Sequence, residues 1–345
     1  MSLILSPQNG KEIDSEILEI YKQKLGGGEL SQLAKLFKGK GLPDRLLTIL
    51  RSTLRVPVRY YREELEIKLA WIDKRPLAKL ANQPKRGELG DAAFFYFEIL
   101  QHNGKASHQQ ARALIMQAKV AKEPKQIASP TVPVNPSNPS PNSSTAREID
   151  LMSQWRTFDL YKTSRSRSAI VKGVSIAPQS RPPAHGWYMA TPGKHPKGSQ
   201  AKAWESPWMC GPAAMGAPCA VTLGELLRSF FTFDTVTAGC NALPEAGATF
   251  KFDPSYMTTP VGNGWDRLCV EILRLCPNNQ LPKSLFGNTG PRGAVITSVV
   301  RSFPYLGRGD GPPDCLSQIT EWLWPRRMPV LLVVMTKIEG ESPAS

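Results

Sequence analysis

The chain has 345 residues, 41% of them hydrophobic, which is enough to form a buried core and excludes a wholly disordered protein. Its 43 Lys and Arg outnumber its 29 Asp and Glu, and the net charge of +14 favours a polyanionic partner, nucleic acid ahead of an anionic membrane surface. The six cysteines lack zinc-site spacing and the first residues lack a signal-peptide pattern, so we expect free thiols, a cytoplasmic protein and no membrane association.

The first 58 residues are predicted to form an N-terminal helical segment. Apolar residues recur at helical spacing over residues 13–25, which end in a run of glycines. Two further helices are expected at residues 30–37 and 43–54. The segment that follows, residues 60–74, is also predicted to be helical.

This expected amphipathic helix rests on three apolar residues. Leu65, Leu69 and Ile72 would share one helical face, with charged residues elsewhere.

Two strands are expected after Pro84. Residues 91–100 are rich in aromatic side chains, residues 102–104 (His-Asn-Gly) are a hairpin-turn signal, and residues 111–120 are largely apolar. Because the second strand is apolar at several consecutive positions from Ala113, it should lie inside a sheet that is covered on both faces.

Residues 128–146 are rich in Pro, Ser and Asn and are predicted to be disordered. Such a stretch is either an interdomain linker or an insertion. We favour an insertion within one domain, because a helix is expected at residues 147–161 and strands at 169–176 and 187–190.

The remaining part, residues 196–345, is predicted to be a C-terminal α+β region without an identified role. Helices are expected at residues 222–231 and 265–275, and strands at 294–300 and 330–336.

One group of polar residues suggests phosphodiester chemistry. Hydrolysis of a phosphodiester needs a hard cation held by oxygen ligands, an activated water and a positive charge near the phosphate. Glu88 lies just before the first predicted strand and Asp91 opens it, and Gln117 and Lys119 share one face of the second, since alternate strand residues face the same side. The hairpin should bring these polar ends together.

These residues resemble the PD-(D/E)xK nucleases, in the Gln-x-Lys variant found in Mrr-type restriction enzymes. The resemblance covers roughly residues 60–191. The same segment is also similar to nuclease modules of bacterial anti-phage defence systems. It implies an α/β fold with a restriction-endonuclease-like core over residues 59–195, in which a mixed central sheet is flanked by helices. The family's core has a helix, three strands, a helix and a further strand.

The resemblance further implies an endonuclease that depends on Mg²⁺ or Mn²⁺ and acts on double-stranded DNA. Asp91, Gln117, Lys119 and Glu88 would be the catalytic residues. Asp91, Gln117 and, from the expected helix at residues 60–74, Glu64 would hold the metal. Gln117 is neutral where many relatives carry Glu, so the negative charge of the site would come mainly from the carboxylates around it.

Three further cations are expected to contact nucleic acid. Arg165, Arg167 and Lys172 lie in or near a predicted loop and could bind phosphates, although a solvated run of charge is an equally good interpretation. The competing hypothesis for the whole chain is a non-catalytic, basic nucleic-acid-binding or assembly protein, such as a nucleocapsid-like protein or a subunit of a defence complex. On the nuclease hypothesis the second half could bind a protein partner.

Overall fold

The computed structural model describes residues 3–22, 27–54, 61–73, 75–81, 83–102, 105–121, 131–132, 143–177, 184–195, 197, 204–214, 216–234, 237–238, 241–243, 245–257, 262–277, 280–282, 299–300 and 327–339. Over these residues the chain forms a mixed α/β structure around a nine-stranded sheet.

The main sheet is mixed, with the strand order β12-β10-β9-β5-β4-β17-β1-β16 and β15 beside β5. Its long strands are β1 (Tyr61–Ile72), β4 (Ala92–His102), β5 (Lys105–Ala121), β9 (Gly186–Pro192) and β17 (Met328–Glu339). Its short strands are β10 (Met209–Pro212), β12 (Val221–Thr222), β15 (Ala248–Thr249) and β16 (Val299–Val300). β4 and β5 pair antiparallel, whereas β17 runs parallel to β4 and β9 runs parallel to β5.

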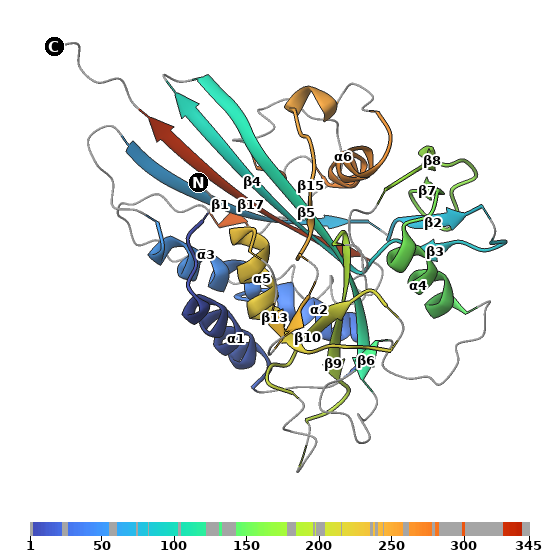
Figure 1. Cartoon of the computed structure of the whole chain (residues 1–345), viewed down its shortest axis with the longest axis horizontal. Coiled ribbons are helices and arrows are strands. Elements are labelled where there is room, and N and C mark those ends of the chain that lie inside the picture. The colour runs from blue at the N-terminus through green and yellow to red at the C-terminus, as the bar shows by residue number, and fades with distance from the viewer. Residues whose placement is uncertain are drawn as a thin grey trace, which may run out of the picture.

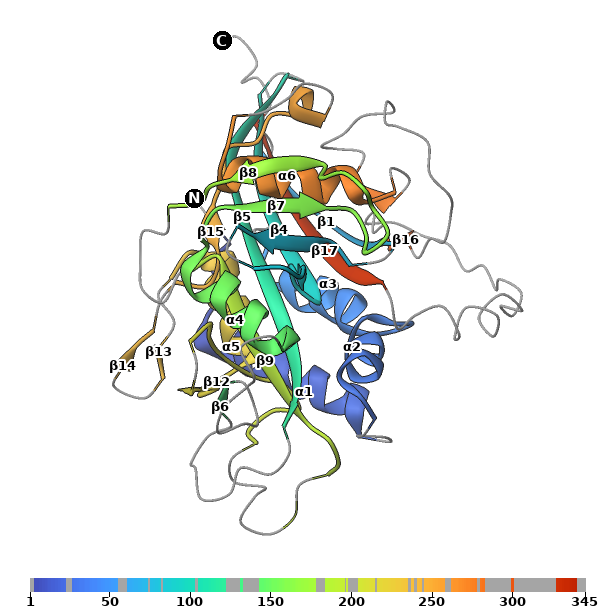
Figure 2. The ribbon, with the colours of Figure 1, turned by 90° about the vertical axis from the view of Figure 1, so that its right-hand side faces the viewer.

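Four helices cover one face of this sheet: α1 (Pro7–Tyr21), α2 (Glu29–Phe37), α3 (Leu42–Ser52) and α5 (Leu223–Thr232). The other face is covered by α4 (Ser144–Gln154), α6 (Trp265–Leu275) and a second, four-stranded sheet. This small sheet has the order β3 (Gly87–Glu88), β2 (Leu77–Leu80), β7 (Phe158–Tyr161) and β8 (Val171–Val174). Figure 1 shows the small sheet and α4 grouped together, away from α1, α3 and α5, and Figure 2 shows β7 and β8 lying alongside α6.

Short elements complete the described structure. β6 (Thr131–Val132) pairs with β11 (Ala217–Pro218), β13 (Thr237–Ala238) pairs with β14 (Asn241–Ala242), and Pro254–Met257 form a 3-10 helix. Among the described helices, none combines the length and the apolar character that are needed to cross a bilayer. The four cysteines that the structure describes, Cys210, Cys219, Cys269 and Cys276, are buried free thiols.

The expected burial of the central strands on both faces is confirmed. Along β5, Leu114 and Met116 pack with the helices α1, α2, α3 and α5, while Ala113 and Ile115 pack on the α4 and α6 side. Because neighbouring side chains of a strand alternate between faces, a strand that is buried on both faces must be apolar at consecutive positions. The helices expected near residues 13–25, 30–37, 43–54, 222–231 and 265–275 are also present. α6 has the expected bounds, α2, α3 and α5 differ from them by one or two residues, and α1 starts six residues earlier and ends four residues earlier.

The amphipathic helix expected at residues 60–74 is wrong, because this segment forms strand β1. Its apolar residues fit both periods, but in the strand Leu65, Ile67 and Leu69 share the face that packs on the N-terminal helices. β1 is hydrogen-bonded to β17 along its whole length, from Tyr61 to Ile72. The partner strand decides the conformation, and it comes from the far end of the sequence.

Two other expectations are corrected near α4. The helix expected at residues 147–161 ends at Gln154, where Trp155 adopts a left-handed conformation with φ 47°, and β7 follows. Residues 143–146 are ordered, because Ser143 caps α4 by accepting a hydrogen bond from the backbone N–H of Ala146 at 3.1 Å. Of residues 128–142, Thr131 and Val132 form β6 and the others lie outside the described residues, as do the turn residues 103–104 and residues 294–298 of an expected strand.

β17 lies between β4 and β1 in the middle of the main sheet. Residues on both sides of the boundary expected at 195 therefore share one hydrogen-bonded sheet. A buried ion pair joins Lys337 Nζ of β17 to Glu98 Oε1 of β4. Within the predicted nuclease core, β1 and β4 are linked through this C-terminal strand.

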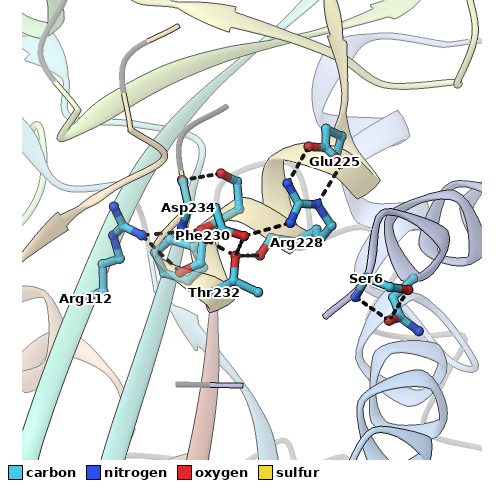
Figure 3. A network of polar contacts seen from close by, with 9 residues as sticks. Ser6, Arg112, Glu225, Arg228, Phe230, Thr232 and Asp234 are labelled. Atoms are coloured by element: carbon cyan, nitrogen blue, oxygen red, sulfur yellow. Dashed lines mark hydrogen bonds and ion pairs between the residues drawn. The ribbon is translucent and has the colours of Figure 1, made fainter. Parts of the chain in front are cut away.

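The middle of β5 is attached to α5 by a buried arginine (Figure 3). Arg112 donates hydrogen bonds to the carbonyl oxygens of Ser229 and Phe230 near the end of α5, both at 3.4 Å. It also contacts the Glu245 carboxylate at 2.8 Å. Burial lowers the pKa of Arg112 to about 10, against the opposing effect of Glu245. A cation close to the last carbonyls of a helix also interacts favourably with the helix dipole.

We predict that residues 1–195 will not fold when they are expressed alone. Without β17, β1 and β4 lose the strand that is hydrogen-bonded to both of them, and the carboxylate of Glu98 loses its ion pair with Lys337. Thermal melts followed by circular dichroism should show one cooperative transition for the full chain and none for the fragment. A cooperative transition of the isolated fragment would show that the core is independent of β17.

Candidate functional site

Asp91 is held at the start of β4 by its contact with the end of β5. Its backbone N–H donates a hydrogen bond to the carbonyl oxygen of Met116 at 2.8 Å. The preceding Gly90 permits this close approach, because a Cβ at that position would lie 2.5 Å from Cγ2 of Ile115. The side chain of Asp91 is fully buried, so its carboxylate must be compensated by protein groups.

Asp91 and Gln117 are in direct contact. Asp91 Oδ2 accepts hydrogen bonds from Gln117 Nε2 and from the backbone N–H of Ala118, the second at 2.9 Å. Because an ionised carboxylate only accepts, this contact fixes which end of the Gln117 amide faces Asp91. The amide oxygen, Gln117 Oε1, is buried and has no hydrogen-bond partner among the described residues.

Arg75 bridges Asp91 and Glu88. Its Nη1 lies 2.7 Å from Asp91 Oδ1 and also contacts Glu88 Oε2. Burial raises the pKa of Glu88 to about 7, reinforced by the charge of Asp91 and opposed by Arg75. Burial lowers the pKa of Arg75, but the charges of Asp91 and Glu88 outweigh that effect and leave it above its ordinary value. A cation is therefore shared by two carboxylates at this point.

Lys119 lies two residues beyond Gln117 and pairs with Glu148 of α4, with Nζ and Oε2 2.7 Å apart. Burial lowers the pKa of Lys119, but the charges of Glu148, Glu29 and Asp91 outweigh it, and the net pKa is raised. Glu29, in the first turn of α2, belongs to the same electrostatic group. Burial raises the pKa of Glu29, while the charge of Lys119 opposes this effect.

The structure therefore brings Asp91, Gln117, Lys119 and Glu88 together at one end of the main sheet. Sequence reasoning missed Arg75, Glu148 and Glu29. Glu148 left a usable signal, since it lies three and four residues before the buried Leu151 and Met152 and so carries a charge on the apolar face of α4. Arg75 and Glu29 follow no motif that we can identify.

Tyr188 was missed as well. It is the Cα partner of Gln117 in the parallel pair of β5 and β9, so both side chains point to the same face. Its hydroxyl is buried without a hydrogen-bond partner among the described residues, and burial raises its pKa well above the ordinary value.

Glu64 is not at the site, which corrects its expected role as a metal ligand. It pairs with Thr336, which in turn pairs with Ile99, eight residues along β4 from Asp91. At a rise of about 3.3 Å per residue the two carboxylates are more than about 20 Å apart. Glu64 is largely exposed and pairs with Arg62 at 3.1 Å. The error follows from the helix that was expected in place of β1.

Arg165, Arg167 and Lys172 are exposed on the segment that joins β7 to β8 and on β8 itself. This basic hairpin, residues 161–174, belongs to the small sheet, whose strand β3 carries Glu88. Glu88 pairs with Leu77, which pairs with Tyr161, so the hairpin begins two strand spacings, or about 10 Å, from Glu88.

Arg86 fixes the start of the basic hairpin. Its guanidinium lies 3.5 Å from the centre of the Tyr161 ring and donates hydrogen bonds to the carbonyl oxygens of Thr163 and Ser164, both at 3.3 Å. The first residues of the hairpin, from which its exposed cations extend, are therefore held in place close to Glu88.

The oxygen atoms of the site suit a hard cation. Among the described residues there is no group of three or more His, Cys, Asp or Glu side chains placed to hold a metal. Mg²⁺, however, is commonly held by one or two carboxylates together with waters. Glu88 and Asp91 are two such carboxylates, with Arg75 Nη1 between them, and the amide of Gln117, which donates to Asp91, carries an oxygen without a hydrogen-bond partner among the described residues.

We predict a pH-dependent effect of Glu88→Gln in metal-free protein. Because the pKa of Glu88 is raised to about 7 in the fold from an ordinary value of 4.5, its ionisation destabilises the folded state as the pH rises through this interval. Glutamine does not ionise. The melting temperature of Glu88→Gln relative to wild type should therefore increase by a few degrees between pH 5 and pH 8.

Glu205 is exposed, and Glu205→Gln is the matched control: its melting temperature relative to wild type should not change with pH. A difference between Glu88→Gln and wild type that stays constant with pH would contradict the raised pKa.

No family model, curated protein or solved structure matches the chain.

Proposed function

We propose that this protein is a metal-dependent nuclease that hydrolyses phosphodiester bonds, with Glu88, Asp91, Gln117 and Lys119 in its active centre. The observation that carries the proposal is the contact between Asp91, at the start of β4, and Gln117, near the end of β5. Lys119 follows two residues later and is electrostatically coupled to Asp91. An acid, an oxygen ligand and a cation at one sheet end are the groups that such hydrolysis requires.

The order of elements supports the resemblance to the PD-(D/E)xK nucleases. The helix α3, the strands β1, β4 and β5, the helix α4 and the strand β9 follow one another in the order of that family's core. β4 and β5 form an antiparallel hairpin, and α4 lies between β5 and the parallel strand β9. This order is reached only by passing over other strands: β2 and β3 lie between β1 and β4, β6 lies between β5 and α4, and β7 and β8 lie between α4 and β9. β17, which separates β1 from β4 in the sheet, is a further departure from the simple pattern.

The side chains have distinct proposed roles. A bound Mg²⁺ or Mn²⁺ would lower the pKa of its water and stabilise negative charge on the phosphate. Glu88 and Asp91 supply the negative charge that holds the ion, and Gln117 supplies a neutral oxygen. Lys119 keeps its proton, since the charge of Glu148 helps to raise its pKa, and it offers a positive charge to the phosphate.

Double-stranded DNA is the proposed substrate, in line with the family resemblance and the net charge of +14. The basic hairpin is the proposed phosphate-binding element, because its exposed cations Arg165, Arg167 and Lys172 lie on the small sheet that also carries Glu88. A role in anti-phage defence with a protein partner follows from the resemblance alone and is proposed on that basis.

A second candidate function is non-catalytic nucleic-acid binding or assembly. It is favoured by the ion pairs within the site, because Arg75 contacts both Asp91 and Glu88 and Lys119 pairs with Glu148. Salt-sensitive DNA binding without any cleavage at millimolar Mg²⁺ or Mn²⁺ would support this function over the nuclease.

Asp91→Asn and Lys119→Ala are predicted to lower the rate of divalent-dependent plasmid cleavage by about 100-fold or more, because each removes a charge needed in the transition state. DNA affinity should stay within about threefold of wild type, since the exposed basic surface is untouched. Cleavage should be measured under single-turnover conditions, together with melting curves that establish folding. Exposed Glu205→Gln and Lys11→Ala are matched controls and should cut at the wild-type rate. Wild-type rates in both site variants would place the active centre elsewhere.

Replacing Arg165, Arg167 and Lys172 together by alanine is predicted to weaken DNA binding uniformly across sequences. The slope of log K against log salt should become shallower by about 0.9 for each phosphate contact that is lost. Fluorescence anisotropy at several salt concentrations measures both quantities. A control triple variant of the exposed cations Lys11, Lys40 and Arg51, on the helical side, should keep the wild-type slope. Equal slopes for the two triple variants would remove the hairpin from the binding surface.

A further inference from the structure

Arg75 occupies the position between the two carboxylates of the site. One guanidinium nitrogen, Nη1, contacts Asp91 Oδ1 and Glu88 Oε2 at the same time. The side chain of Arg75 is 17% exposed and that of Asp91 is fully buried, so water screens this contact poorly. A cation held jointly by Asp91 and Glu88 would have to lie where this nitrogen lies.

Arg75 leaves one buried polar atom of the site without a partner, the amide oxygen of Gln117. Gln117 is fully buried and donates its amide nitrogen to Asp91, yet its oxygen has no hydrogen-bond partner among the described residues. A buried carbonyl oxygen without a partner is unfavourable, and a cation that displaced Arg75 and was coordinated by this oxygen would remove that cost.

The local charge balance points in the same direction. The carboxylates of Glu29, Glu88, Asp91 and Glu148 outnumber the cations of Arg75 and Lys119 that interact with them. A divalent ion matches this excess of negative charge better than one guanidinium does.

We propose that Arg75 is an internal counter-cation that keeps the site in a metal-free state, and that binding of a divalent cation displaces its guanidinium from Glu88 and Asp91. This rests on the proposed function, in which these two carboxylates hold the metal. The displaced guanidinium is a bidentate donor that suits a phosphate group. Bound DNA therefore gives Arg75 an alternative partner, and metal and DNA should each strengthen the binding of the other.

The test is calorimetric titration of Mn²⁺ into wild type, Arg75→Gln and Arg75→Lys. Removing the competing charge should tighten Mn²⁺ binding about tenfold in Arg75→Gln, within the usual range of coupling between sites. Arg75→Lys keeps the charge and should remain within about threefold of wild type. Arg86→Gln is the matched control, because Arg86 directly precedes β3 of the same small sheet and its side-chain hydrogen bonds go to the carbonyls of Thr163 and Ser164.

Melting curves provide a readout that does not depend on activity. Without metal, Arg75→Gln should be less stable than wild type, because Asp91 and Glu88 lose their shared cation. Mn²⁺ should raise its melting temperature more than it raises that of wild type.

The coupling to DNA is measured by repeating the titrations with Ca²⁺ in the presence of a short DNA duplex, so that hydrolysis does not interfere. Wild type should bind Ca²⁺ several-fold more tightly with DNA than without it, and this gain should be lost in Arg75→Gln.

If Arg75→Gln does not fold, wild-type protein still decides the question. The Nε–H signal of Arg75 in a nitrogen-15 spectrum, identified with Arg75→Lys, should shift during a Mg²⁺ titration as the ion pairs break. A signal that stays unchanged while Mg²⁺ binds would overturn the proposal.

The outcomes separate the two proposals. Equal Mn²⁺ affinity in wild type and Arg75→Gln overturns the role of Arg75 and leaves the nuclease intact. Tighter binding in Arg75→Gln without DNA cleavage by any form supports the role of Arg75 and overturns the nuclease. No divalent-cation binding by either protein overturns both.

Discussion

The buried carboxylate of Asp91 is the constraint on which the site depends. A charge without access to water must be compensated by hydrogen bonds and counter-ions, and Asp91 receives the amide of Gln117, the backbone N–H of Ala118 and the guanidinium of Arg75. The first two contacts fix the start of β4 against the end of β5. The third fixes the chain that leads into β2, and with it the small sheet that carries Glu88 and the basic hairpin.

Coverage of the main sheet on both faces decides where chemistry can take place. Helices α1, α2, α3 and α5 pack on one face, and α4, α6 and the small sheet pack on the other, so the middle of each long strand is inaccessible. Polar side chains can meet a ligand only where the strands end. Gln117 and Lys119 lie near the end of β5 and Asp91 lies just before β4, so the residues of the candidate site lie at such an end.

The same site can be viewed as a permanent network of ion pairs or as the proposed metal site without its ion. Both views use the same contacts, and they differ in whether the guanidinium of Arg75 is a permanent partner of Asp91 and Glu88. The unpartnered oxygen of Gln117 and the excess of carboxylates favour the second view.

By itself, the sequence determined the β4–β5 hairpin and the convergence of Asp91, Gln117 and Lys119, because strand parity and a local turn are short-range properties. It also determined most helices, since their periodicity and caps are local. Only the tertiary structure decided that residues 61–72 form β1, because the strand that stabilises it, β17, lies more than two hundred residues away. For the same reason, only the tertiary structure showed that Glu64 lies far from the site and that Arg75, Glu148 and Glu29 belong to it. Pairing between distant segments depends on how the whole core packs, and no local pattern records it.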